Sequence, residues 1–141
     1  MCQALEVINR GLKEDGTLAF TYHHSDEESW GELLESLCNT GFEVTATYPI
    51  NSDLMKFIGG EAVAFDIVIV ARPSDDQTPI SWRRLRIDIL NRLELLRESL
   101  EDRELTQGDV GVVAMGACFA EYSKHHGEVR RDGEIMTAKE A

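Results

Sequence analysis

The sequence predicts a three-layer α/β protein: a small mixed sheet with helices on both faces and further helices at the C-terminal end. Residues 3–50 alternate between helical and strand periodicity. The run "AVAFDIVIVA" at 62–71 is almost continuously apolar, which is typical of a strand covered on both faces. After Pro73 and Pro79, apolar residues return at helical spacing, which predicts the C-terminal helices.

The first helix and the first strand are predicted to be short. Between residues 3 and 13, apolar side chains recur every three or four positions, which predicts an amphipathic helix. Asp15-Gly16 predicts the turn that ends this helix. The β-rich stretch "TLAFTY" then predicts a strand near 17–23.

A second helix follows this strand. Ser25 and Glu28 form the S-x-x-E pattern of a capping box, and Gly41 supplies a stop. Its predicted buried stripe consists of Trp30, Leu33, Leu34 and Leu37. His23 and His24 therefore lie at the junction between a strand and a helix.

Two further strands are predicted near 42–49 and 62–71. In "FEVTATYPI" one face carries Phe42, Val44, Ala46 and Tyr48, and the wetter face carries Glu43, Thr45 and Thr47. The connection between the strands contains Gly59-Gly60 and no helix. The two strands are therefore predicted to pair antiparallel, which makes the sheet mixed.

The rest of the chain is predicted to be mainly helical. Residues 74–79 are polar and are the best linker candidate. A long helix begins near Trp82, and its apolar positions are Leu85, Ile89, Leu93, Leu96 and Leu100. A helix lined with small residues is predicted at about 109–123, and Asp132-Gly133 predicts a turn between two short extended segments.

Arginines lie between the apolar positions of the long helix. Arg83, Arg84 and Arg86 are candidate contacts to nucleic-acid phosphates. The favoured alternative is a solvated helix face. On such a face the arginines of this helix pair with acidic residues, for which the candidates are Glu94, Glu98 and Glu101.

The charge balance argues against independent DNA binding. The chain has 26 acidic and 14 basic residues, a formal net charge of −12, and its basic residues are ten arginines and four lysines. A surface that binds duplex DNA on its own is normally basic. Strong acidity with few lysines is also compatible with adaptation to high salt, and an ordinary acidic surface explains it equally well.

The three cysteines predict neither a disulfide framework nor a metal site. Cys2, Cys38 and Cys118 are far apart and odd in number, which favours a reducing compartment. Cys118, His125 and His126 match no recurring zinc spacing, so a buried thiol is the favoured interpretation of Cys118. The apolar runs are too short for a membrane span and no signal-peptide pattern is found, so we expect a soluble cytoplasmic protein.

One long stretch resembles a known enzyme family. "GLKEDGTLAFTYHHSDEESWGELLESLCNTGFEVTATYPINSD" closely resembles a segment of the adenine-specific DNA methylases that often carry a zinc ribbon. In that family a "G.L.F.FHH" strand precedes "W..L...L...GF.V....P". The ending "GACFAEYSKHHGEVRRDGEIMTAKEA" also resembles the family's C-terminal segment, whereas Tyr22 and Ile50 replace commoner family residues.

The resemblance implies the C-terminal part of a class I S-adenosylmethionine-dependent methyltransferase. The implied fold is a partial Rossmann-like domain in which the last strand is inserted antiparallel. The implied reaction is methyl transfer to the exocyclic amine of an adenine flipped from the duplex. Residues 1–73 would be the C-terminal half of the methyltransferase domain, and residues 74–141 a helical extension packed on it.

The family's motifs for catalysis and cofactor binding are absent from this sequence. It has no acidic-Pro-Pro-aromatic loop, and Gly108-x-x-Gly111 precedes a late helix instead of following a strand. We therefore expect no catalytic or cofactor-binding residue here, and no S-adenosylmethionine binding or activity by this chain alone. The expected partners are the remainder of the methyltransferase domain, DNA through the full-length enzyme, and a second copy of the chain.

His23 and His24 are the candidates for lining the base pocket. Ligands of open α/β sheets collect outside the carboxyl ends of parallel strands, where this pair is predicted to lie. Adjacent strand residues point to opposite sides, so we expect one imidazole to face the pocket and the other to pack or to be solvated. The alternative for the pair is a solvated junction. The alternative for the chain is a free-standing interaction or dimerisation module without catalysis.

Overall fold

The computed structural model describes residues 2–24, 26–58, 61–100, 102–103 and 105–141, with the backbone alone for 51–58 and 61–65. The helices are α1 (Cys2–Gly11), α2 (Glu27–Asn39), α3 (Trp82–Glu98), α4 (Gln107–Tyr122) and the short η1 (Ser123–His125). The strands are β1 (Leu18–Tyr22), β2 (Phe42–Ile58), β3 (Glu61–Pro73), β4 (Ile80–Ser81), β5 (Val129–Arg131) and β6 (Glu134–Ile135). The predicted α/β class is confirmed. No helix within these ranges combines the length and apolarity that a bilayer crossing requires.

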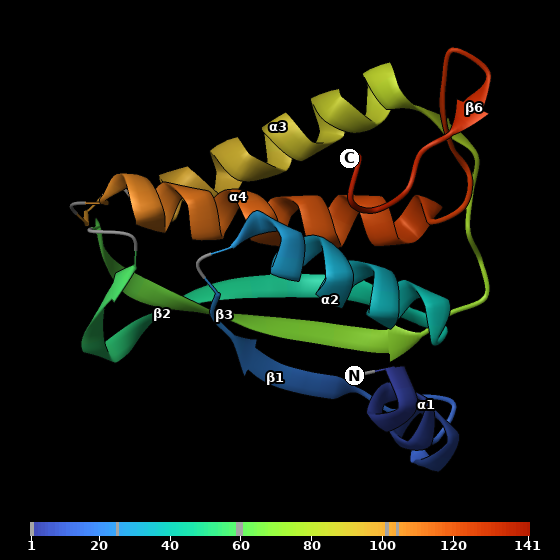
Figure 1. Cartoon of the computed structure of the whole chain (residues 1–141), viewed down its shortest axis with the longest axis horizontal. Coiled ribbons are helices and arrows are strands. Elements are labelled where there is room, and N and C mark those ends of the chain that lie inside the picture. The colour runs from blue at the N-terminus through green and yellow to red at the C-terminus, as the bar shows by residue number, and fades with distance from the viewer. Residues whose placement is uncertain (1, 25, 59–60, 101, 104) are drawn as a thin grey trace.

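The main sheet has the strand order β1-β3-β2 (Figure 1). β3 runs antiparallel to both neighbours, so β1 and β2 run parallel to each other, and α2 connects them. The predicted antiparallel pairing of the last two strands is confirmed. The sheet itself is antiparallel throughout and not mixed, because β3 separates the two parallel strands.

Helices cover one face of this sheet. Ile67, Ile69 and Ala71 of β3 are fully buried on the face that α2 and α4 cover (Figure 1). Val68 and Val70 point to the other face and are only half-buried, between cross-strand neighbours. The predicted central position of β3 is confirmed. Helical cover on both faces is not found in the described part of the chain.

A β-bulge in β2 reverses the predicted faces of the residues that follow it. The register shifts by one residue between Val44 and Ala46, so Thr45 is an extra residue in the strand. Because side chains alternate along a strand, one extra residue exchanges the two faces beyond it. Thr47 is therefore buried, with 4% exposure, and Tyr48 is 56% exposed. The sequence predicted the opposite for both.

β2 and β3 are longer than predicted. They pair as far as Ile58 and Glu61, whereas the sequence places strands at 42–49 and 62–71 with a loop between them. The polar residues after position 49 led to the prediction that the strand ends there. Main-chain pairing in a hairpin does not require apolar side chains, so the strand continues. Gly59-Gly60 lies outside the described residues.

The predicted stripe of α2 forms part of the core, with every member at most 4% exposed: Trp30, Leu33, Leu34 and Leu37. Gly41, with φ of 83°, provides the predicted stop. The N-cap is Asp26, whose carboxylate accepts a hydrogen bond from the Ser29 backbone N–H at 3.2 Å. The predicted cap Ser25 lies outside the described residues.

The C-terminal segment packs on the sheet through α4. α4 lies on β2 and β3, and α3 lies on α4 (Figure 1). The Ser123 hydroxyl, next to the end of α4, accepts a hydrogen bond from the Val44 backbone N–H at 2.9 Å. A second sheet, β4-β5-β6, contains the predicted turn at Asp132 and Gly133, with φ of 51° and 90°. One hydrophobic core thus includes residues from both 1–73 and 74–141, and the second segment is not only helical.

Candidate functional site at the β1–α2 junction

His23 directly follows β1, at the carboxyl end of that strand. Its Nδ1 lies 3.2 Å from Oδ1 of Asp66 in β3, and the two side chains are 13% and 19% exposed. The pair continues the register of Thr21 and Val68, so both side chains lie on the sheet face that α2 and α4 leave open. When Nδ1–H donates to Asp66, the imidazole is held in the tautomer whose Nε2 accepts a hydrogen bond.

His24 has different surroundings. Its Nδ1 accepts a hydrogen bond from the Asp26 backbone N–H at 3.1 Å, and its carbonyl accepts one from Trp30 Nε1 at 2.9 Å. Its ring stacks on Tyr22 with the ring centroids 6.4 Å apart. These contacts fix the start of α2, which gives His24 a structural role. The base-pocket roles of His23 and His24 stay predictions.

Two titratable groups near the histidines, Asp26 and Tyr22, have shifted pKa values. A hydrogen bond from the Ser29 hydroxyl lowers the pKa of the Asp26 carboxyl, so the helix cap stays ionised in neutral solution. Burial, together with the charges of Glu32 and Asp26, raises the pKa of Tyr22. Tyr22 is therefore a neutral phenol that donates to the Ser29 carbonyl, with the two oxygens 3.4 Å apart.

The candidate arginines lie elsewhere. Arg83, Arg84 and Arg86 are exposed at the N-terminal end of α3. Figure 1 shows this end of α3 well away from the junction between β1 and α2. The structure therefore does not bring these arginines together with His23, and their contact to nucleic acid stays a prediction.

The arginines of α3 do pair with acidic residues, as the favoured alternative predicted, but the partners differ from the predicted ones. Arg84 pairs with Asp88 at 3.2 Å, and Arg92 pairs with Glu121 of α4. The sequence predicted pairing along α3 itself, with Glu94, Glu98 and Glu101, the last of which lies outside the described residues. The partner on α4 was missed because it depends on how two helices pack.

Cys118, His125 and His126 have separate surroundings. Burial raises the pKa of the Cys118 thiol to about 11, so this half-buried side chain stays protonated. His125 Nδ1 lies 2.7 Å from the Thr78 carbonyl oxygen, and His126 Nε2 lies 3.1 Å from Asn39 Oδ1. In the described ranges, no three His, Cys, Asp or Glu side chains form a group that could hold a metal ion.

The sequence indicated the two histidines but not the partner of His23. The relevant signal was Asp66, the only charged residue in the apolar run 62–71. A charge in such a strand is costly unless it is paired, so an interrupted apolar run predicts a partner nearby. Strand order was needed to identify that partner as His23.

Comparison with known proteins identifies no relative of this chain. The resemblance in residues 11–53 and 116–141 is therefore a prediction from the sequence. No protein-family model, curated protein or solved structure matches the chain.

Proposed function

We propose that this chain is the C-terminal part of an S-adenosylmethionine-dependent DNA adenine methyltransferase. Its reaction is methyl transfer to the exocyclic amine of adenine, and this part is inactive alone. The strand order β1-β3-β2 carries the proposal, because two mutually parallel strands, connected through α2, enclose a reversed strand. The same strand order is expected at the end of the partial Rossmann-like sheet that the sequence resemblance implies.

The outer edge of β1 supports the same proposal. Within the described residues, β1 pairs only with β3 and its other edge has no strand beside it. An open edge offers main-chain donors and acceptors to another strand. In the proposed enzyme the preceding half of the sheet pairs with this edge, which makes the remainder of the domain the principal partner of this chain.

The position of His23 suggests its role in the longer enzyme. The flipped adenine would lie outside the carboxyl end of β1, which His23 follows. Asp66 holds the imidazole in one orientation, so His23 is suited to position the base or its neighbouring backbone. Arg83, Arg84 and Arg86 stay candidates for phosphate contacts farther from the base.

The test compares this chain with the longer protein obtained by including the coding sequence upstream of Met1. Both are incubated with S-adenosylmethionine and DNA, and methylated adenine is measured by mass spectrometry of the nucleosides. The longer protein should methylate DNA, and this chain should neither methylate DNA nor give a calorimetric signal with S-adenosylmethionine. A micromolar cofactor site in this chain contradicts the proposal. So does inactivity of a longer protein that contains both missing motifs.

A pair of variants in the longer enzyme tests the role of His23. His23→Ala should lower turnover by about 10- to 100-fold, or about 1.4 to 2.8 kcal/mol, because a positioning contact is lost. His24→Ala is the matched control. It should lower the stability of the protein, because its contacts fix the start of α2, and should change turnover less than His23→Ala does. Thermal unfolding of both variants separates the two effects. Full activity of a stable His23→Ala variant would contradict the positioning role of His23, and two fully active, fully stable single variants would show that neither histidine has a functional role.

A free-standing interaction or dimerisation module is the second candidate. The half-buried Val68 and Val70 on the open face, together with the outer edge of β1, favour it. This candidate predicts a concentration-dependent dimer in sedimentation experiments. It gains support if the upstream coding sequence contains neither a Gly-rich loop nor an acidic-Pro-Pro-aromatic motif.

A further inference from the structure

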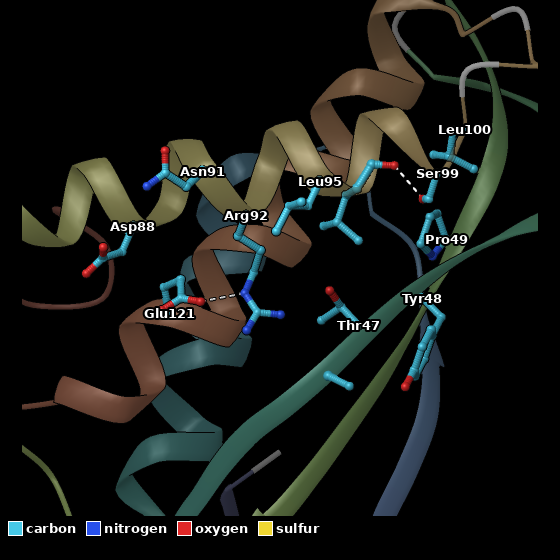
Figure 2. A pocket seen from close by; sticks show the side chains of 12 residues that line it. Thr47, Tyr48, Pro49, Asp88, Asn91, Arg92, Leu95, Ser99, Leu100 and Glu121 are labelled. Carbon is cyan, nitrogen blue, oxygen red and sulfur yellow. Dashed lines mark hydrogen bonds and ion pairs between the residues drawn. The ribbon is translucent and has the colours of Figure 1, made fainter.

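A cavity of about 770 Å³ lies between β2, α3 and α4 (Figure 2). This volume is in the range of pockets that bind small organic molecules. Its apolar wall includes Pro49 on β2, Leu95 and Leu96 in the last turn of α3, and Leu100, two residues after the end of that helix. The cavity is on the helix-covered face of the sheet, so it is separate from the His23 and Asp66 pair on the open face.

Thr47 places an unsatisfied hydroxyl at this cavity. The bulge at Thr45 turns Thr47 to the covered face, and only 4% of the residue is exposed. In the part of the chain that the structure describes, its Oγ1 has no hydrogen-bond partner. Gly116 of α4 makes room for this oxygen, because a Cβ there would lie 2.9 Å from it. A buried hydroxyl without a partner is destabilising, so a ligand atom that bonds to it gains binding energy.

Arg92 supplies a cation beside this hydroxyl. Its Nε donates to Glu121, and Figure 2 shows the guanidinium extending from α3 toward Thr47. Glu121 also accepts from Lys124 Nζ at 2.9 Å. Burial alone would raise the pKa of Glu121, but the hydrogen bonds and charges of Arg92 and Lys124 outweigh it and lower the pKa. Glu121 is therefore ionised and binds two cations.

The second carboxylate at the cavity is also neutralised from outside. Asp88 pairs with Arg84 at 3.2 Å, and the Arg84 side chain is 67% exposed. Each of the two wall carboxylates thus has a cation of its own that lies outside the cavity lining, Lys124 for Glu121 and Arg84 for Asp88. Arg92 therefore leaves one net positive charge at this cavity, although the chain as a whole has a formal net charge of −12.

We propose that this cavity binds a small organic carboxylate with an apolar body. The carboxylate accepts hydrogen bonds from the Nη atoms of Arg92 and from the Thr47 hydroxyl, and the apolar body packs on the leucines of α3. The site is independent of the methyltransferase proposal, because it uses the opposite face of the sheet and no missing motif.

The binding test uses the whole chain, isotope-labelled for NMR, and two pairs of probes. Phenylbutyrate and octanoate are each titrated beside their neutral amides. The carboxylates should give saturable shifts at residues 46–49 and 91–96, with affinities at least about tenfold above those of the amides. Equal affinities for acid and amide would overturn the assignment of a carboxylate. The absence of saturable shifts with all four probes at millimolar concentration would overturn the site.

Variants test the two polar contacts. Thr47→Val has nearly the same shape and should raise the melting temperature while weakening carboxylate binding at least about fivefold, because the unsatisfied hydroxyl is removed. A purely structural hydroxyl does not give this combination. Arg92→Gln should abolish the preference for acid over amide, and Arg10→Gln, at an exposed arginine of α1 outside the cavity, is the control. If Arg92→Gln fails to fold, Thr47→Val decides. Unchanged affinity in Thr47→Val would overturn the proposal.

Discussion

β3 presents apolar β-branched residues on both faces of the β1-β3-β2 sheet, but the two faces have different surroundings. On the covered face Ile67 and Ile69 are 0% exposed, whereas Val68 and Val70 on the open face are half-buried, although all four are consecutive β-branched residues. The apolar sequence of β3 therefore predicts burial on both faces, whereas the described part of the chain places helices on one face only. The open face of β3 is compatible with the proposed fragment of a larger domain, whose remainder would cover it.

The largest difference in stability between the two faces is expected when neighbouring residues of β3 are truncated to alanine. Ile69→Ala removes a fully buried side chain and should lower the free energy of unfolding by about 2 to 5 kcal/mol. Val70→Ala should lower it by about 1 kcal/mol, because that side chain is already half in water. Urea unfolding of both variants measures the difference. Similar losses would show that the open face is covered in solution.

Two glycines of α4 test how closely the covered face is packed. Gly116→Ala should cost about 1 to 3 kcal/mol, since its Cβ would overlap Ile67 Cδ1 and approach Thr47 Oγ1. Gly111→Ala is the matched control in the same helix, where a Cβ meets nothing within 4 Å. It should stabilise the protein by about 0.5 to 1 kcal/mol, because alanine favours helix. A stabilising Gly116→Ala would mean that α4 can move off the sheet.

The sequence predicted the parts of the fold that depend on local periodicity. The stripes of α2 and α3 and the turn at Asp132-Gly133 need only neighbouring residues to be recognised. The bulge at Thr45 was not predicted, because it arises from pairing with β3 and leaves no mark in the alternating pattern of β2. The exchange of Thr47 and Tyr48 between faces follows from that single event.

The candidate sites show the same limit. The position of His23 and His24 at the end of β1 follows from local sequence, as does their opposite orientation. Asp66, the partner of His23, lies 43 positions further along the chain, and the strand order that joins them is set by tertiary packing. The cavity beside Thr47 and Arg92 requires three elements to meet, so no local pattern predicts it.

Acidification should weaken the contacts that hold α3 to α4 above the covered face. The pKa of Glu121 is lowered in the folded protein, so its contribution to stability is fully present above the unfolded value of about 4.3 and is lost as the pH falls through the folded value. Glu121→Gln should cost roughly 1 to 2 kcal/mol at neutral pH and progressively less below about pH 4. Glu94→Gln, at an exposed site on α3, is the control for the removal of one negative charge. A difference between Glu121→Gln and the unmodified protein that does not depend on pH would contradict this account of the ion pairs.

The smallest effect is expected from a hydroxyl placed on the open face. Val70→Thr should change the free energy of unfolding by less than about 0.5 kcal/mol, because the half-buried hydroxyl can bond to water. Val44→Thr makes the same change at a fully buried position of the covered face, and should cost about 1 to 3 kcal/mol when the hydroxyl finds no partner. Both variants are unfolded in urea at two protein concentrations. If Val70→Thr is as costly as Val44→Thr, and more so at the higher concentration, a second copy of the chain covers the open face. A small and concentration-independent change would show that no second copy covers the open face, as expected if the remainder of the proposed methyltransferase domain covers it.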